Sequence, residues 1–211
     1  MTIKLVMGGF TLSIISAYAP QAGLDKEEKR RFWEDLDEAV GSIPPNEKLF
    51  VGGDFNGHNG SVSRGYDDVH GGFGFRDRNG GGVSLLDFAK AFGLVVANSS
   101  FPKKKEHLVT FRNSAAATQI YFLLLRKDDK GLCKDCNVIP SENLTTQHKL
   151  LVIDLEIKRK KKKRVVDDRS RIRWGSLTLF SALEMGEKSA LGAWDSRGDA
   201  TKWDRKPTDR K

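Results

Sequence analysis

Apolar side chains recur in two periodic patterns along this chain, and the first predicts helices. Residues 26–40 carry apolar positions four apart among charged ones, which is typical of an amphipathic surface helix. Residues 83–92 repeat a helical apolar pattern, and the Asn-Gly-Gly-Gly stretch at 79–82 before them predicts a mobile loop. Two surface helices of ordinary length are therefore expected.

The second pattern consists of short apolar runs bounded by turn residues, and it predicts strands. Six such runs occur, at residues 10–17, 48–51, 94–98, 110–112, 119–126 and 149–157. Because these runs alternate with the helical segments, the pattern favours a layered α/β fold.

The most distinctive polar residues follow the run at 48–51, where the chain reads Gly52-Gly53-Asp54-Phe55-Asn56. The glycines permit a sharp turn or a close approach. In an extended chain the two polar residues, Asp54 and Asn56, share one face. A carboxylate there can hold Mg2+ or orient a water, and the carboxamide can donate to a phosphate oxygen. The alternative is a plain polar turn after a strand.

Two other strands carry polar motifs at their ends, Ser16-Ala17-Tyr18-Ala19-Pro20 and Thr146-Gln147-His148. The three motifs in this order resemble the endonuclease/exonuclease/phosphatase superfamily. With the segments at 65–72 and 132–140, the resemblance over roughly residues 1–175 is closest to the endonuclease domain of non-LTR retrotransposons and to craniofacial development protein 2-like plant proteins.

This resemblance implies a four-layer α/β sandwich and Mg2+-dependent hydrolysis of phosphodiesters or phosphomonoesters. By resemblance, Tyr18 hydrogen-bonds the scissile phosphate, and Asp54 orients or deprotonates the attacking water and supplies a metal ligand. Asn56 stabilises the oxyanion, and His148 stabilises the phosphorane-like transition state.

The chain departs from the family pattern in three ways, and two of these departures, Tyr121 and the missing glutamate, predict an impaired site. Tyr121 stands where relatives carry an aspartate that supports the histidine, so we expect His148 to be less well oriented. Gln147 replaces an aspartate of the wider superfamily. The family's metal-binding glutamate precedes the Ser-Ala-Tyr-Ala-Pro strand, and residues 2–15 contain no acidic side chain. We therefore expect an incomplete sandwich and weak Mg2+ binding through Asp54.

Charge divides the chain into two parts. Residues 158–211 hold 17 of the 36 Lys and Arg residues and 8 of the 28 Asp and Glu residues, which leaves 19 basic and 20 acidic residues in residues 1–157. We predict a partial domain at 1–157 that lacks its N-terminal strands, a basic linker at 158–175 and a disordered tail at 176–211. The longest cationic run is Lys158, Arg159, Lys160, Lys161, Lys162, Lys163 and Arg164.

This run suits a nuclear localisation signal or a sequence-independent phosphate contact, with a solvated linker as the alternative. Only two cysteines occur in the chain, and there is no long apolar segment. The sequence therefore predicts an intracellular protein with no membrane span, and its basic run is compatible with a nuclear location.

The glycine-rich stretch at 57–82 contains neither of the common nucleotide-binding glycine motifs, so no nucleotide cofactor is expected. Within it, His58, Asn59, Arg76 and Arg78 are candidates for nucleic-acid contacts, with a plain surface loop as the alternative. His70 is interpreted as an ordinary exposed histidine.

Cys133 and Cys136 form a lone Cys-x-x-Cys, which falls short of a four-ligand zinc site and predicts reduced structural thiols.

Two functions remain open at this point. The first is an active Mg2+-dependent DNA endonuclease. The second is a retrotransposon-derived, catalytically impaired domain that at most binds nucleic acid through its basic linker. The missing glutamate and Tyr121 favour the second.

Overall fold

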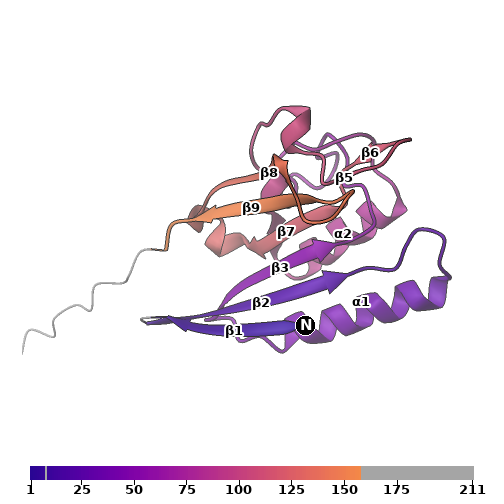
Figure 1. The fold of residues 1–211 in the computed structure, drawn as a ribbon. Helices are drawn as coiled ribbons and strands as arrows, with labels where there is room; N and C mark the ends of the chain where they lie inside the picture. Colours follow the sequence, from indigo (N-terminus) through magenta and orange to yellow (C-terminus); the bar gives the residue numbers. More distant parts are fainter. Residues whose placement is uncertain (8, 158–211) are drawn as a thin grey trace, which may run out of the picture. The chain divides into compact units, whose positions relative to one another are not determined.

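The fold comes from a computed structural model, which describes residues 1–7 and 9–157 (Figure 1). The predicted basic linker at 158–175 and the predicted tail at 176–211 lie outside the described residues, as does the cationic run at 158–164. All three strand-end motifs lie within the described part of the chain.

A five-stranded sheet forms the centre of this part, in the order β1-β2-β3-β7-β4. Strands β2 and β3 run parallel, and each of the other neighbouring pairs is antiparallel. The strands are β1 (Thr2–Met7), β2 (Phe10–Tyr18), β3 (Lys48–Asp54), β7 (Tyr121–Arg126) and β4 (Leu94–Val96). Together with the helices they confirm the mixed α/β class that the sequence predicted.

Two helices, α1 (Lys26–Gly41) and α2 (Gly80–Ala91), pack against one face of this sheet. Their apolar stripes meet the inward side chains of β2, β3 and β7, so that Leu36, Leu85 and Phe122 share one core. Burial of such side chains is worth roughly 1.5–3 kcal/mol each. Helix α1 ends at Gly41, one residue beyond its predicted end.

The prediction of a loop at residues 79–82 is wrong. Gly80, Gly81 and Gly82 form the first turn of α2, and the side chain of Asn79 accepts a hydrogen bond from the backbone N–H of Gly82 at 2.9 Å. This cap satisfies one of the free amides at a helix start, and it offsets part of the conformational entropy that glycine loses in a helix.

A hairpin of β8 (Cys133–Asn143) and β9 (Lys149–Leu155) packs on the other face of the sheet. A second apolar cluster joins the two, with Leu12, Phe50 and Leu125 from the sheet and Cys136 from β8. Burial raises the pKa of the Cys133 thiol to about 11 and raises that of Cys136 as well. Both cysteines are free thiols, consistent with the structural role predicted for them.

The remaining short elements connect these layers. They are the 3-10 turns η1 (Ala97–Ser99), η2 (Lys105–His107) and η3 (Lys127–Leu132), and the small hairpin of β5 (Phe111–Arg112) and β6 (Ala117–Thr118). In the described ranges 1–7 and 9–157, no helix has both the length and the apolar character that crossing a bilayer requires.

The glycine pair before Asp54 has a role different from the predicted sharp turn. Strand β3 continues straight through Gly52 and Gly53 to Asp54. A Cβ atom on Gly53 would lie 1.8 Å from the backbone oxygen of Ala17 on β2, and one on Gly52 would lie 2.5 Å from Leu123 on β7. The glycines therefore allow the neighbouring strands to approach β3 closely beside the strand-end motif.

The long loop between β3 and α2 is held by internal hydrogen bonds. His70 is 1% exposed, so its interpretation as an exposed histidine is wrong. Its Nδ1 accepts from the N–H of Gly72 at 3.0 Å, and its Nε2 lies 3.1 Å from the carbonyl oxygen of Gly60. Since Nδ1 accepts, Nε2 carries the proton and donates to Gly60. A neutral, buried imidazole thus fastens two turns of the loop together.

Candidate active site at the strand ends

Three of the residues singled out in the sequence form a row across adjacent strands. Tyr18 on β2 lies opposite Asp54 on β3, and Asp54 lies opposite Tyr121 on β7. Residues paired in this way project their side chains from the same face of a sheet. The fold therefore brings two phenols to either side of one carboxylate, although the three residues lie far apart in the sequence.

Asp54 is the charged member of this row, and it is 7% exposed. Burial raises the pKa of its carboxyl group, while a hydrogen bond from the backbone of Asn56 and the proximity of His148 act in the opposite direction. A carboxylate that is partly desolvated is a better base than one in water. Tyr18 is 68% exposed beside it, so its phenol is open to a ligand.

Asn56 is positioned by a turn and not by the extended chain that the sequence interpretation assumed. Its φ is +47°, so the strand ends at Asp54. The backbone N–H of Asn56 donates to Oδ1 of Asp54 at 2.9 Å, and its side-chain Nδ2 donates to the carbonyl oxygen of Ala19 at 2.7 Å. Asn56 therefore ties the end of β3 to the Ala19 segment, and it keeps one side-chain N–H for another acceptor.

His148 approaches the row from the segment before β9. Its Nδ1 lies 2.5 Å from the hydroxyl oxygen of Tyr121, and the two rings stack with centroids 5.3 Å apart. The ring of Phe111 meets the imidazole edge-on at 4.9 Å. In place of the aspartate expected to support His148, the phenol supplies a hydrogen-bonding partner and a stacking surface.

The other candidates lie in different settings. Gln147 is exposed, and its backbone carbonyl oxygen accepts a hydrogen bond from the backbone N–H of Arg112 at 2.8 Å. Arg78 donates to the carbonyl oxygens of loop residues, among them Asn59 at 2.9 Å, and its guanidinium lies 4.8 Å from the ring centroid of Tyr66. Arg76 is exposed. Arg78 thus stabilises the loop, and Arg76 is the freer of the two cations.

Two of the candidates for nucleic-acid contacts, His58 and Asn59, are less exposed than residues of a plain surface loop. Asn59 is fully buried, and both polar atoms of its side chain lack a hydrogen-bonding partner among the described residues. Burial lowers the pKa of His58, and the nearby Arg76 adds to this effect. The side chain of Asn59 is therefore removed from the surface on which a nucleic acid would lie.

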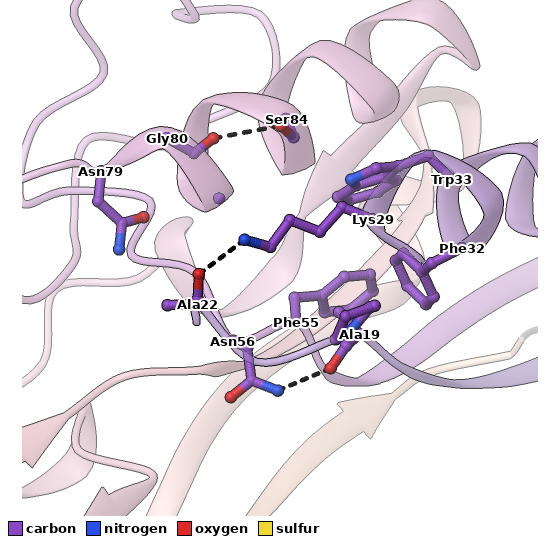
Figure 2. Close-up of a pocket in the computed structure, with 12 residues that line it drawn as sticks. Ala19, Ala22, Lys29, Phe32, Trp33, Phe55, Asn56, Asn79, Gly80 and Ser84 are labelled. Carbon is purple, nitrogen blue, oxygen red and sulfur yellow. Dashed lines mark hydrogen bonds between the residues drawn. The ribbon is translucent and has the colours of Figure 1, made fainter. Parts of the chain in front are cut away.

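A pocket of about 460 Å³ adjoins Asn56 on the side of the two helices (Figure 2). Phe55, Phe32 and Trp33 provide its aromatic wall, and the first turn of α2 provides its polar side. The amino group of Lys29 crosses toward the carbonyl oxygen of Ala22 and lies 2.6 Å from it (Figure 2). The pocket extends the site from Asn56 to the start of α2, and no local sequence pattern signals it.

The donor set does not fit a complete Mg2+ site. Hard divalent cations take several oxygen ligands in proteins, usually including carboxylates. Asp54 is the acidic member of the strand-end row, and Tyr121 occupies the position opposite it. Over residues 1–7 and 9–157 there is no group of three His, Cys, Asp or Glu side chains that could hold a metal ion.

The fold of the described residues is similar to that of solved nuclease structures, in agreement with the resemblance seen in the sequence. No family model matches the sequence. Craniofacial development protein 2 from Tragulus javanicus is 29% identical over 153 residues, which cover 72% of this chain, and the protein of the same name from Bos taurus is 28% identical over the same length. The alignment covers 26% of each of these proteins, so the chain spans about a quarter of the length of the curated relatives it matches.

Solved structures agree on the fold. The endonuclease domain of TRAS1, a telomere-specific non-LTR retrotransposon, superposes with a TM-score of 0.55 at 13% identity, covering 75% of this chain and 62% of that one. A 3'-5' exonuclease from Neisseria meningitidis gives a TM-score of 0.53 at 13% identity, covering 74% of this chain and 65% of that one. At such identities the likeness establishes the fold, as the sequence resemblance predicted.

Proposed function

We propose that this domain recognises a phosphodiester of nucleic acid at its strand-end site, and that hydrolysis there is impaired. The observation that carries the proposal is the row of Tyr18, Asp54 and Tyr121 with His148 stacked against it. Two of these four side chains, Tyr18 and His148, can donate to a phosphate oxygen, and the hydroxyl of Tyr121 is paired with His148. A single carboxylate is present for base chemistry.

Recognition rests on donors that add no negative charge. The exposed phenol of Tyr18, the remaining amide N–H of Asn56 and the imidazole of His148 can each donate to a phosphate oxygen. The names of similar structures support nucleic acid as the ligand class. One is a retrotransposon endonuclease, and a Neisseria 3' phosphatase of the same fold has been solved with a product DNA hairpin.

Impairment follows from the charge balance at Asp54. An ionised carboxylate repels a phosphodiester unless a cation neutralises one of the two. Enzymes that transfer or hydrolyse phosphoryl groups use bound cations to stabilise the charge of the transition state. Because the described residues offer one carboxylate to such a cation, we propose weak Mg2+ binding through Asp54 and assign no catalytic step to the metal.

A plasmid-nicking assay tests the impairment. The full chain and its Asp54→Ala variant are incubated with supercoiled plasmid, in Mg2+ and in EDTA. We expect equal, background nicking in all four samples. Nicking by the unmodified chain that requires Mg2+ and disappears in the variant would show an active endonuclease and overturn the proposal.

A binding assay tests recognition at the site. Fluorescence anisotropy with a short DNA duplex in EDTA compares the full chain with Tyr18→Phe and His148→Gln variants, and each change should weaken binding by about threefold to tenfold. A chain without residues 158–164 serves as the matched control for the cationic run. If only that deletion weakens binding, the run and not the strand-end site holds the DNA, and the proposal fails.

A further inference from the structure

The contact between Tyr121 and His148 determines which nitrogen of the imidazole is left for a ligand. Nδ1 lies 2.5 Å from the hydroxyl of Tyr121. Among residues 1–7 and 9–157, no hydrogen-bonding partner contacts Nε2. Of the two ring nitrogens, Nε2 is therefore the one that an incoming phosphate oxygen can reach.

The positions of the protons in the Tyr121–His148 pair follow from the chemistry of a phenol and an imidazole. A phenol is a stronger hydrogen-bond donor than a neutral imidazole N–H, and an imidazole nitrogen is a stronger acceptor than a phenol oxygen. Burial raises the pKa of Tyr121, and the nearby Asp54 and Tyr18 raise it further, so the phenol keeps its proton. Tyr121 therefore donates to Nδ1, and the imidazole of His148 carries a proton on Nε2.

Thr110, which is fully buried, holds the backbone segments that carry Tyr121 and His148 in place. Its hydroxyl oxygen accepts the N–H groups of Ile120 at 2.9 Å and Tyr121 at 3.1 Å. Its carbonyl oxygen accepts the N–H of Lys149, the residue after His148, at 2.8 Å. One residue thus fixes the start of β7 relative to the start of β9, and with them the distance between phenol and imidazole.

We propose that Tyr121 is a positioning residue that holds His148 as the tautomer protonated on Nε2, so that the site presents an Nε2–H donor to a phosphate oxygen. This inference rests on the proposed function, in which a phosphodiester occupies the site. It gives Tyr121 a role opposite to that of a carboxylate at the same place, because a carboxylate accepts a hydrogen bond from Nδ1–H whereas the phenol donates one to Nδ1.

The tautomer is measured directly by two-bond 15N–1H correlation spectra of the full chain labelled with 15N-histidine, at pH 8, above the ordinary titration range of histidine. The His148→Gln variant identifies the resonances of His148 among the four histidines. We expect shifts of a ring protonated on Nε2, a mixture of tautomers in Tyr121→Phe, and protonation on Nδ1 in Tyr121→Asp. A wild-type ring that is a mixture, or protonated on Nδ1, would refute the inference.

A double-mutant cycle then links the tautomer to binding. In the DNA anisotropy assay, Tyr121→Phe should weaken binding by about fivefold in the normal background and have no effect in the His148→Gln background. An equal effect in both backgrounds would mean that Tyr121 does not act through His148, which would overturn the inference. If the tautomer is as expected but neither His148→Gln nor Tyr18→Phe alters binding, the proposed function fails and the positioning of His148 stands.

Discussion

The loop between β3 and α2 should loosen in acid because of His70. The imidazole is buried, accepts from the N–H of Gly72 and donates to the carbonyl oxygen of Gly60. Burial lowers its pKa most, the bond to Gly60 opposes this, and the nearby charges of Arg78 and Asp67 act in opposite directions. The folded loop therefore disfavours the protonated form.

The lowered pKa of His70 determines how the stability of the loop changes with pH. The unfolded loop takes up a proton near the ordinary histidine value of about 6.5, whereas the folded loop does so only at lower pH. The stability that His70 contributes is therefore complete above about pH 6.5, and it is lost as the pH falls through the lowered folded pKa.

The size of the effect comes from the hydrogen bond that protonation breaks. A proton on Nδ1 would face the N–H of Gly72, which leaves two buried donors against each other. One unsatisfied buried donor costs about 1–3 kcal/mol, and proton uptake by the open loop near pH 6.5 limits the gain at pH 5, so the open fraction of the loop should rise about 5- to 30-fold between pH 7.5 and pH 5. The amide of Gly72 reports this opening through hydrogen exchange, and the amide of Val51 in the centre of β3 is the internal reference.

The measurement compares protection of Gly72 and Val51 between pH 7.5 and pH 5, after correction for the intrinsic exchange rates. Protection of Gly72 should fall relative to Val51 in the wild type and in a His107→Gln control. In His70→Gln this dependence on pH should disappear. A constant ratio of the two protection factors in the wild type would show that His70 does not hold the loop.

Three substitutions test other parts of the structure by the free energy of unfolding in urea. Gly53→Ala should cost about 1–3 kcal/mol and weaken DNA binding, because its Cβ would lie 1.8 Å from the backbone oxygen of Ala17; an unchanged midpoint would contradict the close strand approach. Asn79→Ala should cost about 1 kcal/mol by removing the cap of α2, whereas Asn79→Asp, which retains a side-chain acceptor, should restore most of it. Thr110→Val should cost about 1–3 kcal/mol for each of the two amides it leaves unpaired, and Thr110→Ser should be milder; equal losses would indicate a packing effect only.

The local pattern predicted the helices and most strands because burial imposes a regular repeat on them. It missed β1, whose residues Thr2 to Val6 are all exposed, so that burial imposes no apolar run on this strand. It also missed β8, in which Pro140 and several charges interrupt a strand with few buried side chains. The predicted start of α2 was too late because three consecutive glycines indicated a loop, although Asn79 is a favourable residue at a helix N-terminus.

The sequence singles out candidate residues of the site but not the contacts between them. Asp54 and Tyr18 stand out because each follows an apolar strand in a recognisable motif. The partnership of Tyr121 with His148 depends on long-range strand pairing that no local pattern encodes. A phenol in place of a carboxylate was also judged by its lack of charge, although its hydroxyl can form the hydrogen bond that positions an imidazole.

The row of paired strand ends has a consequence for how the domain folds. Strands β1 and β2 are neighbours in the sequence and can pair early, whereas β3 must close a long loop to meet β7. Closing long loops delays the contacts that depend on them. Refolding experiments should therefore find that the hairpin of β1 and β2 forms before β3 pairs with β7, with that pairing appearing in the final kinetic phase.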